Sequence, residues 1–345
     1  MRTLSAVVSV LILAACGSAP RDVSSTPTPT PTPVSPSPSP SASATSTDTG
    51  PGLRVFVDER GVSVEVASTE RIIPLDGDVA EIVFALGMGD RVVATDLSAT
   101  YPPEADALPQ IGYQRALNTE PILEFDPTLV IGTDIAGPPA VIDELERVGV
   151  AVAIVPTPDD ATGPATKIRA IAELLGVAER GEELAAIVER EIAAVAPLAP
   201  DSPEVPPLRV AMLYLRGEST QLIFGEGTSI DWLIEATGSV NVAIEMGVVD
   251  TADISAEALI VAAPDVLIVT EDGLASVGGI EGLLSMPAIA GTPAAAHRAV
   301  LAYDTQLMLG NGPRTGEFLA NLVANLGDIM TRLSVERDDT NKETP

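Results

Sequence analysis

The sequence predicts an α/β protein of two lobes joined by a helical bridge. Short apolar runs alternate with helical patterns over residues 71–156, and the same alternation starts again at residue 209. Two amphipathic helical stretches lie between the two series. Short apolar strands separated by helices are typical of parallel sheets covered on both faces, and 345 residues suit two ordinary domains.

The composition excludes several classes of function. The chain carries 19 Lys and Arg against 49 Asp and Glu, a net charge of −30, so phosphate backbones would repel it and no nucleic-acid partner is expected. A single cysteine excludes a disulfide framework and a thiolate zinc cluster. A single histidine excludes His-rich metal sites and argues against a Ser-His-Asp triad.

Residues 1–15 are predicted to be a lipoprotein signal peptide. A short positive start precedes an apolar run over residues 4–15, which is too short to span a bilayer. The run ends in Leu-Ala-Ala before Cys16 and resembles the lipobox of bacterial lipoproteins. The resemblance implies cleavage before Cys16 and a diacylglycerol on its thiol, which places the protein on the outer face of the cytoplasmic membrane. The alternative is an ordinary signal peptide with a chance cysteine.

Residues 16–51 are predicted to form a stalk. Between residues 24 and 49, 22 of 26 residues are Ser, Thr or Pro, so this segment cannot fill a core. Alternating prolines favour polyproline II, a semi-rigid tether of about 3.1 Å per residue.

The folded body divides into three further segments and a tail. The first lobe is assigned to residues 52–176, the bridge to residues 177–198, the second lobe to residues 199–335 and a polar, frayed tail to residues 336–345. In the first lobe and the bridge the patterns predict a hairpin at 53–66, strands at 71–75, 91–95, 128–132 and 150–156, and helices at 78–86, 138–148, 166–175 and 179–195. In the second lobe they predict strands at 209–215, 221–224, 266–270 and 300–303, and helices at 229–237 and from residue 316.

Tyrosine–arginine pairs recur in both predicted lobes. Of the four tyrosines, two stand two residues before an arginine, as Tyr113–Arg115 and Tyr214–Arg216. On an extended segment such residues share a face, so each lobe can present a phenol beside a guanidinium. The arginine favours the phenolate, a hard ligand suited to ferric iron, and can itself bind carboxylates. The alternative is a core tyrosine at a strand end beside a surface arginine.

Four other features carry weaker predictions. Glu81 either closes a helix N-terminus in a capping box with Asp78 or is an exposed carboxylate at a lobe tip. The glycine-rich residues 225–229 could cradle an anion before a helix, or simply form a turn. His297 is expected to be a solvated loop residue, and Trp232 a core residue.

Several segments resemble one family of transport proteins. Residues 72–87, Ile-Ile-Pro-Leu-Asp-Gly-Asp-Val-Ala-Glu-Ile-Val-Phe-Ala-Leu-Gly, are similar to the opening of cluster A (class III) substrate-binding proteins of bacterial ABC importers. Further segments resemble the haemin-binding lipoproteins of the HmuT type, at residues 95–103, 111–117, 126–134, 136–139, 214–217 and 312–316. The resemblance covers most of residues 71–326.

The resemblance implies two Rossmann-like lobes on one long bridging helix, with little hinge movement and with haemin held in the cleft as the transported ligand. It implies that side chains of the two lobes bind the iron, here Tyr113 and Tyr214. Some relatives carry histidine at the first of these positions, whereas this chain carries tyrosine. Three arginines are candidates for the haem propionates, namely Arg115, Arg216 and Arg314.

The resemblance also implies partners. One glutamate per lobe is expected to dock on arginines of an ABC permease that works with its own ATPase, and Glu81 and Glu235 are assigned to this role, with Glu226 as a rival to Glu235. The protein is expected to be a monomer and to catalyse no reaction. Alternatives are the same fold binding a ferric siderophore or a corrinoid, a cell-surface hydrolase, and a stalked adhesion module.

Overall fold

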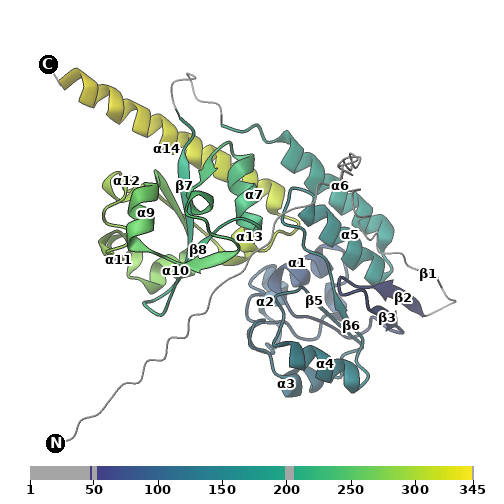
Figure 1. Cartoon of the computed structure of the whole chain (residues 1–345). Coiled ribbons are helices and arrows are strands. Elements are labelled where there is room, and N and C mark those ends of the chain that lie inside the picture. Colours follow the sequence, from purple (N-terminus) through teal and green to yellow (C-terminus); the bar gives the residue numbers. More distant parts are fainter. Residues whose placement is uncertain (1–46, 49–52, 199–205, 344–345) are drawn as a thin grey trace, which may run out of the picture. The chain divides into compact units, whose positions relative to one another are not determined.

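The computed structural model describes residues 47–48, 53–198 and 206–343, which all belong to one compact unit of the chain. The predicted signal peptide, Cys16 and nearly all of the stalk lie outside the described residues. The predicted fold class is confirmed, because two α/β lobes are joined by helix α6 (Ala178–Ala194) (Figure 1). The limits assigned to the segments from sequence stay predictions. Within the described ranges, no helix is long and apolar enough to cross a membrane.

The first lobe is built on a parallel sheet of three strands in the order β4-β5-β6. All three strands are buried and apolar, as predicted for a sheet covered by helices. Its strands and helices are β4 (Ile72–Pro74), α1 (Gly77–Ala85), the 3-10 helix η1 (Gly89–Arg91), α2 (Pro103–Asp106), α3 (Thr119–Leu123), β5 (Leu129–Gly132), α4 (Pro139–Arg147), β6 (Val152–Ile154) and α5 (Gly163–Leu175).

A small antiparallel sheet precedes this lobe. Strands β2 (Arg54–Val57) and β3 (Ser63–Val66) form the predicted hairpin, and β1 (Thr47–Asp48) pairs with β2. Phe56, Val64 and Val66 are buried in the core that lies beneath α5 and α6. The hairpin is therefore an integral part of the first lobe.

The prediction of a strand at residues 91–95 is wrong. The segment begins with the turn of η1 and then makes only isolated bridges, Ile72 with Val92 and Thr95 with Gln110. The reason is local, since Gly89 and Asp90 favour a turn that removes the first residue from the edge of the sheet.

Helix α6 carries the connection between the lobes. It packs against α5, where Gly181 has no room for a side chain because an added Cβ would lie 2.1 Å from the Cβ of Ala172. Leu184 packs on the first-lobe core, and Ile192 packs on the cores of both lobes. The amphipathic pattern of the predicted bridge therefore reflects burial against two different partners.

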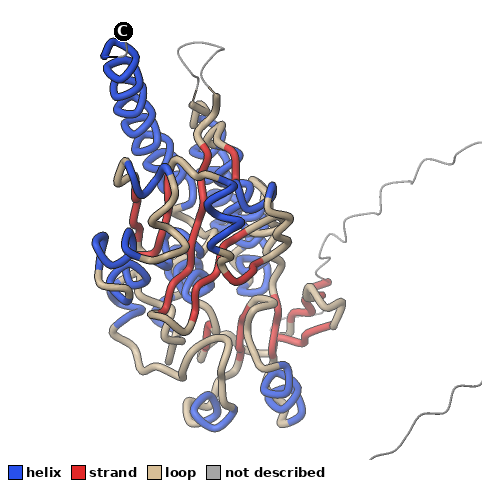
Figure 2. Tube along the Cα trace, turned by 60° about the vertical axis from the view of Figure 1, so that its left-hand side comes forward, coloured by secondary structure: helices blue, strands red, loops and turns tan. Residues whose placement is uncertain are grey.

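The second lobe has a mixed sheet in the order β10-β8-β7-β11-β12, with β9 beside β7. Strands β9, β7, β11 and β12 pair in parallel, whereas β8 runs antiparallel to both of its neighbours, β7 and β10, so the sheet is mixed. Figure 2 shows helices on both sides of these strands. The elements are β7 (Arg209–Arg216), β8 (Thr220–Phe224), α7 (Ser229–Ala236), β9 (Val240–Asn241), α8 (Val242–Glu245), β10 (Thr251–Asp253), α9 (Ala256–Ala262), β11 (Val266–Thr270), α10 (Glu271–Ser276), α11 (Gly279–Ser285), α12 (Pro293–Ala296), β12 (Val300–Tyr303), α13 (Thr305–Leu309) and α14 (Thr315–Glu343).

The last helix is longer than predicted. Helix α14 continues to Glu343, whereas residues 336–345 were expected to form a frayed tail. No glycine or proline interrupts the sequence after Gly327 until the final Pro345, and Glu336 pairs with His297 of the second lobe at 2.6 Å. A run without helix breakers thus extends the helix beyond the core that its first half covers.

Candidate functional site

Tyr214 lies near the end of β7, paired in register with Leu222 of β8. Its ring packs edge-on against Phe224, with the ring centroids 6.3 Å apart. The guanidinium carbon of Arg216 lies 4.6 Å from the centroid of the same ring. The strand therefore places the phenol and the guanidinium on one face, as the i, i+2 spacing predicts.

The surroundings of Tyr214 keep its hydroxyl protonated in the ligand-free protein. Burial raises the pKa of Tyr214 above its ordinary value, and a hydrogen bond with Tyr113 raises it further. The charges of Arg216 and Arg115 lower the pKa, but these effects are smaller than that of burial. The arginines favour the phenolate, as predicted, but burial outweighs them, so a metal ion would have to displace the proton.

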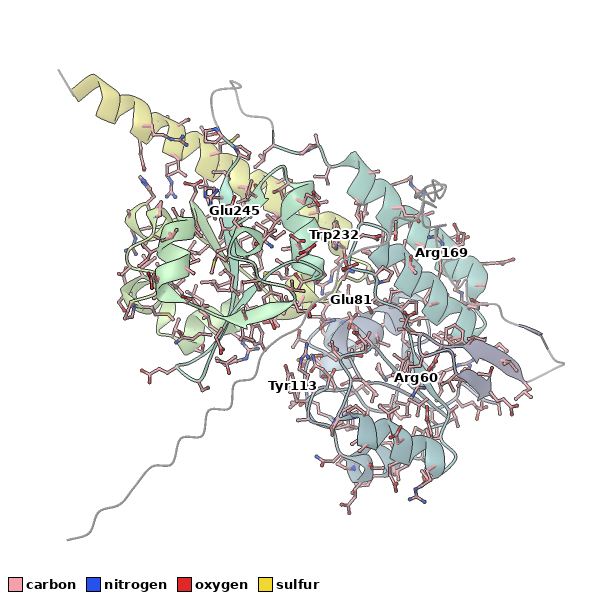
Figure 3. The ribbon with its side chains drawn as sticks, viewed as in Figure 1. Arg60, Glu81, Tyr113, Arg169, Trp232 and Glu245 are labelled. Carbon is pink, nitrogen blue, oxygen red and sulfur yellow. The ribbon has the colours of Figure 1, made fainter. Side chains whose placement is uncertain are left out.

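Tyr113 comes from a loop of the first lobe and is 38% exposed (Figure 3). The loop follows Gly112, whose φ of 113° is a conformation that favours glycine, and it is held where Gly112 accepts a hydrogen bond from the backbone of Leu97. Because Tyr113, Arg115 and Arg216 all shift the pKa of Tyr214, four predicted residues from the two lobes lie near one another: Tyr113, Arg115, Tyr214 and Arg216.

Arg314 and Glu81 contact each other and do not join the tyrosine–arginine group. Two hydrogen bonds of 2.8 Å join the Arg314 guanidinium to the Glu81 carboxylate, and only 5% of Glu81 is exposed. Glu81 is neither a cap nor an exposed carboxylate. Helix α1 begins at Gly77 after Asp76, which makes no side-chain capping bond, and burial of Glu81 excludes the lobe-tip interpretation. Docking through Glu81 would require this ion pair to break.

The remaining predicted residues lie elsewhere. Glu235 on α7 and Glu226 in the loop before it are both exposed. Trp232 is buried in the second-lobe core, as predicted (Figure 3).

Two weaker predictions have clear outcomes. The turn at Gly227 faces the carboxylates of Asp159 and Asp250, each 3.7 Å from the position of an added Cβ, so it does not favour an anion. His297 is an exposed loop residue, as predicted, and its Nδ1 contacts Glu336. Across the described ranges, no group of three or more His, Cys, Asp or Glu side chains could hold a metal ion.

An internal repeat was missed in the sequence. Residues 119–133 and 256–270 share a glutamate in the first turn of a short helix, then a proline, then a buried strand. The residue before each proline adopts a left-handed conformation, with φ of 44° at Asp126 and 47° at Ala263. The two glutamates, Glu120 and Glu257, are exposed. The signal that could have revealed them is the matched order of Glu, Pro and apolar strand.

Comparisons with known proteins agree with this architecture. The model of the family described as periplasmic binding protein matches residues 72–307. This chain is also similar to the vitamin B12-binding protein of Vibrio vulnificus (strain CMCP6), with 32% identity over 88 residues. The match covers 26% of this chain and 32% of the length of that protein.

Three solved structures match at higher coverage. The periplasmic heme-binding protein RhuT from Roseiflexus sp. RS-1, in apo form, is 46% identical with a TM-score of 0.71, over 76% of this chain and 100% of that one. The heme-binding protein HmuT is 35% identical with a TM-score of 0.73, over 83% and 93% of the two chains. The periplasmic heme-binding protein BhuT, in complex with two hemes, is 33% identical with a TM-score of 0.68, over 76% of this chain and 100% of that one. The fold, the family match over well over half of the sequence and these relatives together place the chain in the periplasmic binding protein family.

Proposed function

We propose that this protein binds haemin between its two lobes and delivers it to an ABC permease. The observation that carries the proposal is the meeting of Tyr113 and Tyr214, each with an arginine two residues on. Phenolate oxygen is a hard ligand for ferric iron, and guanidinium groups suit the two propionates of haemin. In a chain of net charge −30, arginines placed beside a tyrosine pair are a specific feature of the site. The names of the similar structures support haem as the cargo.

Tyr214 is proposed as the principal iron ligand, with Tyr113 as the second ligand or as a hydrogen-bond donor to the bound phenolate. Because burial holds the pKa of Tyr214 above its ordinary value, iron binding at neutral pH releases its proton. Haemin affinity should therefore fall as the pH falls, by about tenfold per pH unit for one released proton. Arg115 and Arg216 are proposed propionate contacts.

The test is an absorption titration of the full chain with haemin, beside three variants. Tyr214→Phe should weaken binding by about tenfold or more and remove the phenolate-to-iron charge-transfer band. Tyr113→Phe should change the spectrum less. Tyr303→Phe is the matched control, because the Tyr303 hydroxyl is bonded to Asn325 within the second lobe.

Two results would contradict the assignment. An unchanged spectrum in Tyr214→Phe would remove Tyr214 as a ligand. A wild-type titration indistinguishable from free haemin would reject the cargo, and the same protein would then be titrated with cobalamin and a ferric siderophore. The likeness to vitamin B12-binding proteins makes cobalamin the first alternative.

Delivery requires a docking surface, and the repeated glutamates are proposed to provide it. Glu120 and Glu257 are exposed at equivalent places in the two lobes, which suits one contact per lobe with paired permease subunits. Glu235 is exposed as well and serves as the comparison. Replacing Glu120 and Glu257 by glutamine should abolish haemin uptake without changing haemin binding. Equal loss of uptake in Glu235→Gln would contradict the assignment.

Anchoring is proposed through Cys16. The lipobox-like sequence before it and the proline-rich segment after it support this anchoring, with the folded body outside the cytoplasmic membrane. Cys16→Ser should release the protein from membranes into the soluble fraction, and a protein that stays bound to membranes would contradict lipidation.

A further inference from the structure

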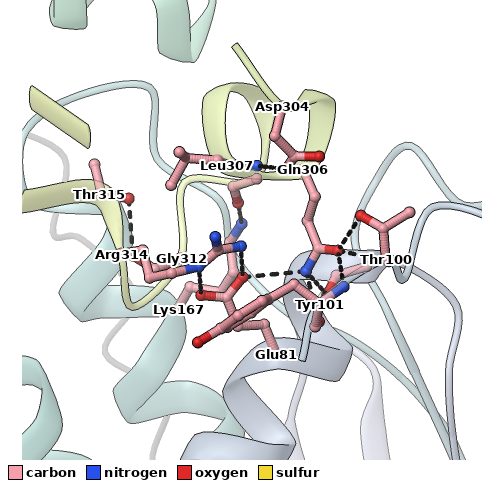
Figure 4. A network of polar contacts seen from close by, with 12 residues as sticks. Glu81, Thr100, Tyr101, Lys167, Asp304, Gln306, Leu307, Gly312, Arg314 and Thr315 are labelled. Carbon is pink, nitrogen blue, oxygen red and sulfur yellow. Dashed lines mark hydrogen bonds and ion pairs between the residues drawn. The ribbon is translucent and has the colours of Figure 1, made fainter. Parts of the chain in front are cut away.

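A second connection joins the lobes besides α6. Residues 304–315 run from the end of β12 to the first residue of α14, yet their side chains reach α1 and the loop before α2 in the first lobe (Figure 4). We call residues 304–315 the clasp segment. Two of its residues, Gln306 and Arg314, make most of the polar contacts.

Gln306 is almost completely buried, with 6% of its surface exposed. Its Nε2 donates to the backbone oxygens of Gly77 and Tyr101, at 2.8 and 2.9 Å, and to Oε2 of Glu81 at 3.1 Å. Its Oε1 accepts from the backbone nitrogens of Thr100 and Tyr101, at 2.8 and 2.9 Å. Every one of these partners lies in the first lobe. Glutamine suits this place because one amide carries both donors and an acceptor.

Arg314 adds a charged contact beside this amide. Its Nε and Nη2 each donate to one oxygen of Glu81, and its guanidinium carbon lies 3.7 Å from the centroid of the Tyr101 ring. The side chains of Arg314 and Glu81 are 22% and 7% exposed. A bidentate pair with so little solvent is geometrically specific and weakly screened by salt.

A third contact fixes the turn between them. Lys167 of α5 forms a buried ion pair with Asp78 and donates to the backbone oxygen of Gly310 at 3.0 Å. An added Cβ at Gly310 would lie 2.5 Å from the backbone oxygen of Gln306 and 3.1 Å from the Cβ of Asp78. The clasp segment therefore approaches α1 as closely as only a glycine allows.

We propose that the clasp segment fixes the separation of the lobes and thereby holds Tyr113 and Tyr214 at the spacing that retains haemin. Gln306 and Glu81 are positioning residues, because they act on the iron ligands through the placement of the lobes. Release of haemin then requires the Glu81–Arg314 pair to open. This inference deepens the proposed function and depends on it only for the identity of the ligand.

The first test measures the lobe separation without any ligand. Cys16 is the only cysteine, so the full chain with Cys16→Ser can carry two spin labels, at exposed Asp143 in the first lobe and Ser285 in the second. Gln306→Glu keeps the shape of the side chain but sets an oxygen against three acceptors, and Arg314→Gln removes the ion pair.

Both clasp variants should lengthen and broaden the distance distribution, by more than about 2 Å. Arg298→Gln is the control, because Arg298 pairs with Glu281 on the surface of the second lobe alone. An unchanged distribution in both folded clasp variants would overturn the proposal, whether or not the protein binds haemin.

The second test measures the rate of haemin transfer to apomyoglobin. Glu81→Gln and Arg314→Gln should each release haemin about tenfold faster or more, and the exchanged pair Glu81→Arg with Arg314→Glu should recover part of the loss. Haemin dimethyl ester separates the clasp from direct propionate binding by Arg314. Equal acceleration with haemin and its ester supports the clasp, whereas acceleration confined to haemin would assign Arg314 to a propionate and overturn it. A wild-type protein that binds no haemin would refute the proposed function, whereas the distance measurement would still test the role of the clasp segment in fixing the lobe separation.

Discussion

Asp76 should make this protein less stable as the pH rises through neutrality. The residue is 1% exposed, between β4 and α1, and its Oδ2 accepts hydrogen bonds from the backbone nitrogen and the hydroxyl of Thr133, at 2.7 and 3.1 Å. Its Oδ1 is buried without a partner. Burial and the nearby charge of Asp78 raise the pKa of Asp76 to about 8, against the opposing effect of Thr133. Burial likewise raises the pKa of Asp96 to about 7.

The sign follows from proton binding in the two states. Between about pH 4 and pH 8 the unfolded chain has an ionised Asp76, whereas the folded protein keeps its proton, so the folded state binds more protons. The free energy of unfolding therefore falls as the pH rises through this window. One pKa unit corresponds to about 1.4 kcal/mol, so the full window is worth several kcal/mol for Asp76 alone.

Asp76→Asn tests the reasoning because an amide resembles the protonated carboxyl but does not titrate. Urea unfolding at pH 5, 6, 7 and 8 can be followed through the fluorescence of Trp232, the single tryptophan, in protein without haemin. At pH 5 the variant should be close to wild type, and at pH 8 it should be the more stable by about 2 kcal/mol or more. Asp143→Asn, at an exposed position on α4, is the control and should keep the wild-type pH profile. A wild type that gains stability from pH 5 to pH 8, or a variant with the wild-type slope, would refute the assignment.

Two further predictions concern stability at neutral pH. Lys167→Met should lower the free energy of unfolding by about 3–5 kcal/mol, because it leaves the buried carboxylate of Asp78 without its cation. A decrease in the free energy of urea unfolding below about 1 kcal/mol would contradict this prediction. Ala263→Gly should raise the free energy of unfolding by about 0.5–1 kcal/mol, because Ala263 adopts a left-handed conformation with a φ of 47°. Ala262→Gly within α9 should instead lower the free energy of unfolding. A change of the same sign in both variants would contradict the explanation from backbone conformation.

The sequence by itself determined the elements whose residues contact the core with a regular period. Strands β4, β5, β7 and β11 were predicted because their apolar runs are buried on both faces. The bridge was predicted from the apolar stripe of α6, and the Tyr214–Arg216 contact from the two-residue repeat of a strand. The family resemblance then named the fold class and the ligand type.

Only the tertiary structure decided which groups meet and which remain solvated. Glu81 and Arg314 are 233 positions apart in the chain, and the residues around neither of them reveal that the two form an ion pair. The same holds for the pKa of Tyr214, where burial outweighs two nearby arginines that the sequence made conspicuous. Periodicity reports whether a side chain faces a core, whereas partners and desolvation depend on where distant segments of the chain lie in the fold. The sequence therefore predicted the strand that carries Tyr214, but not the burial of Glu81.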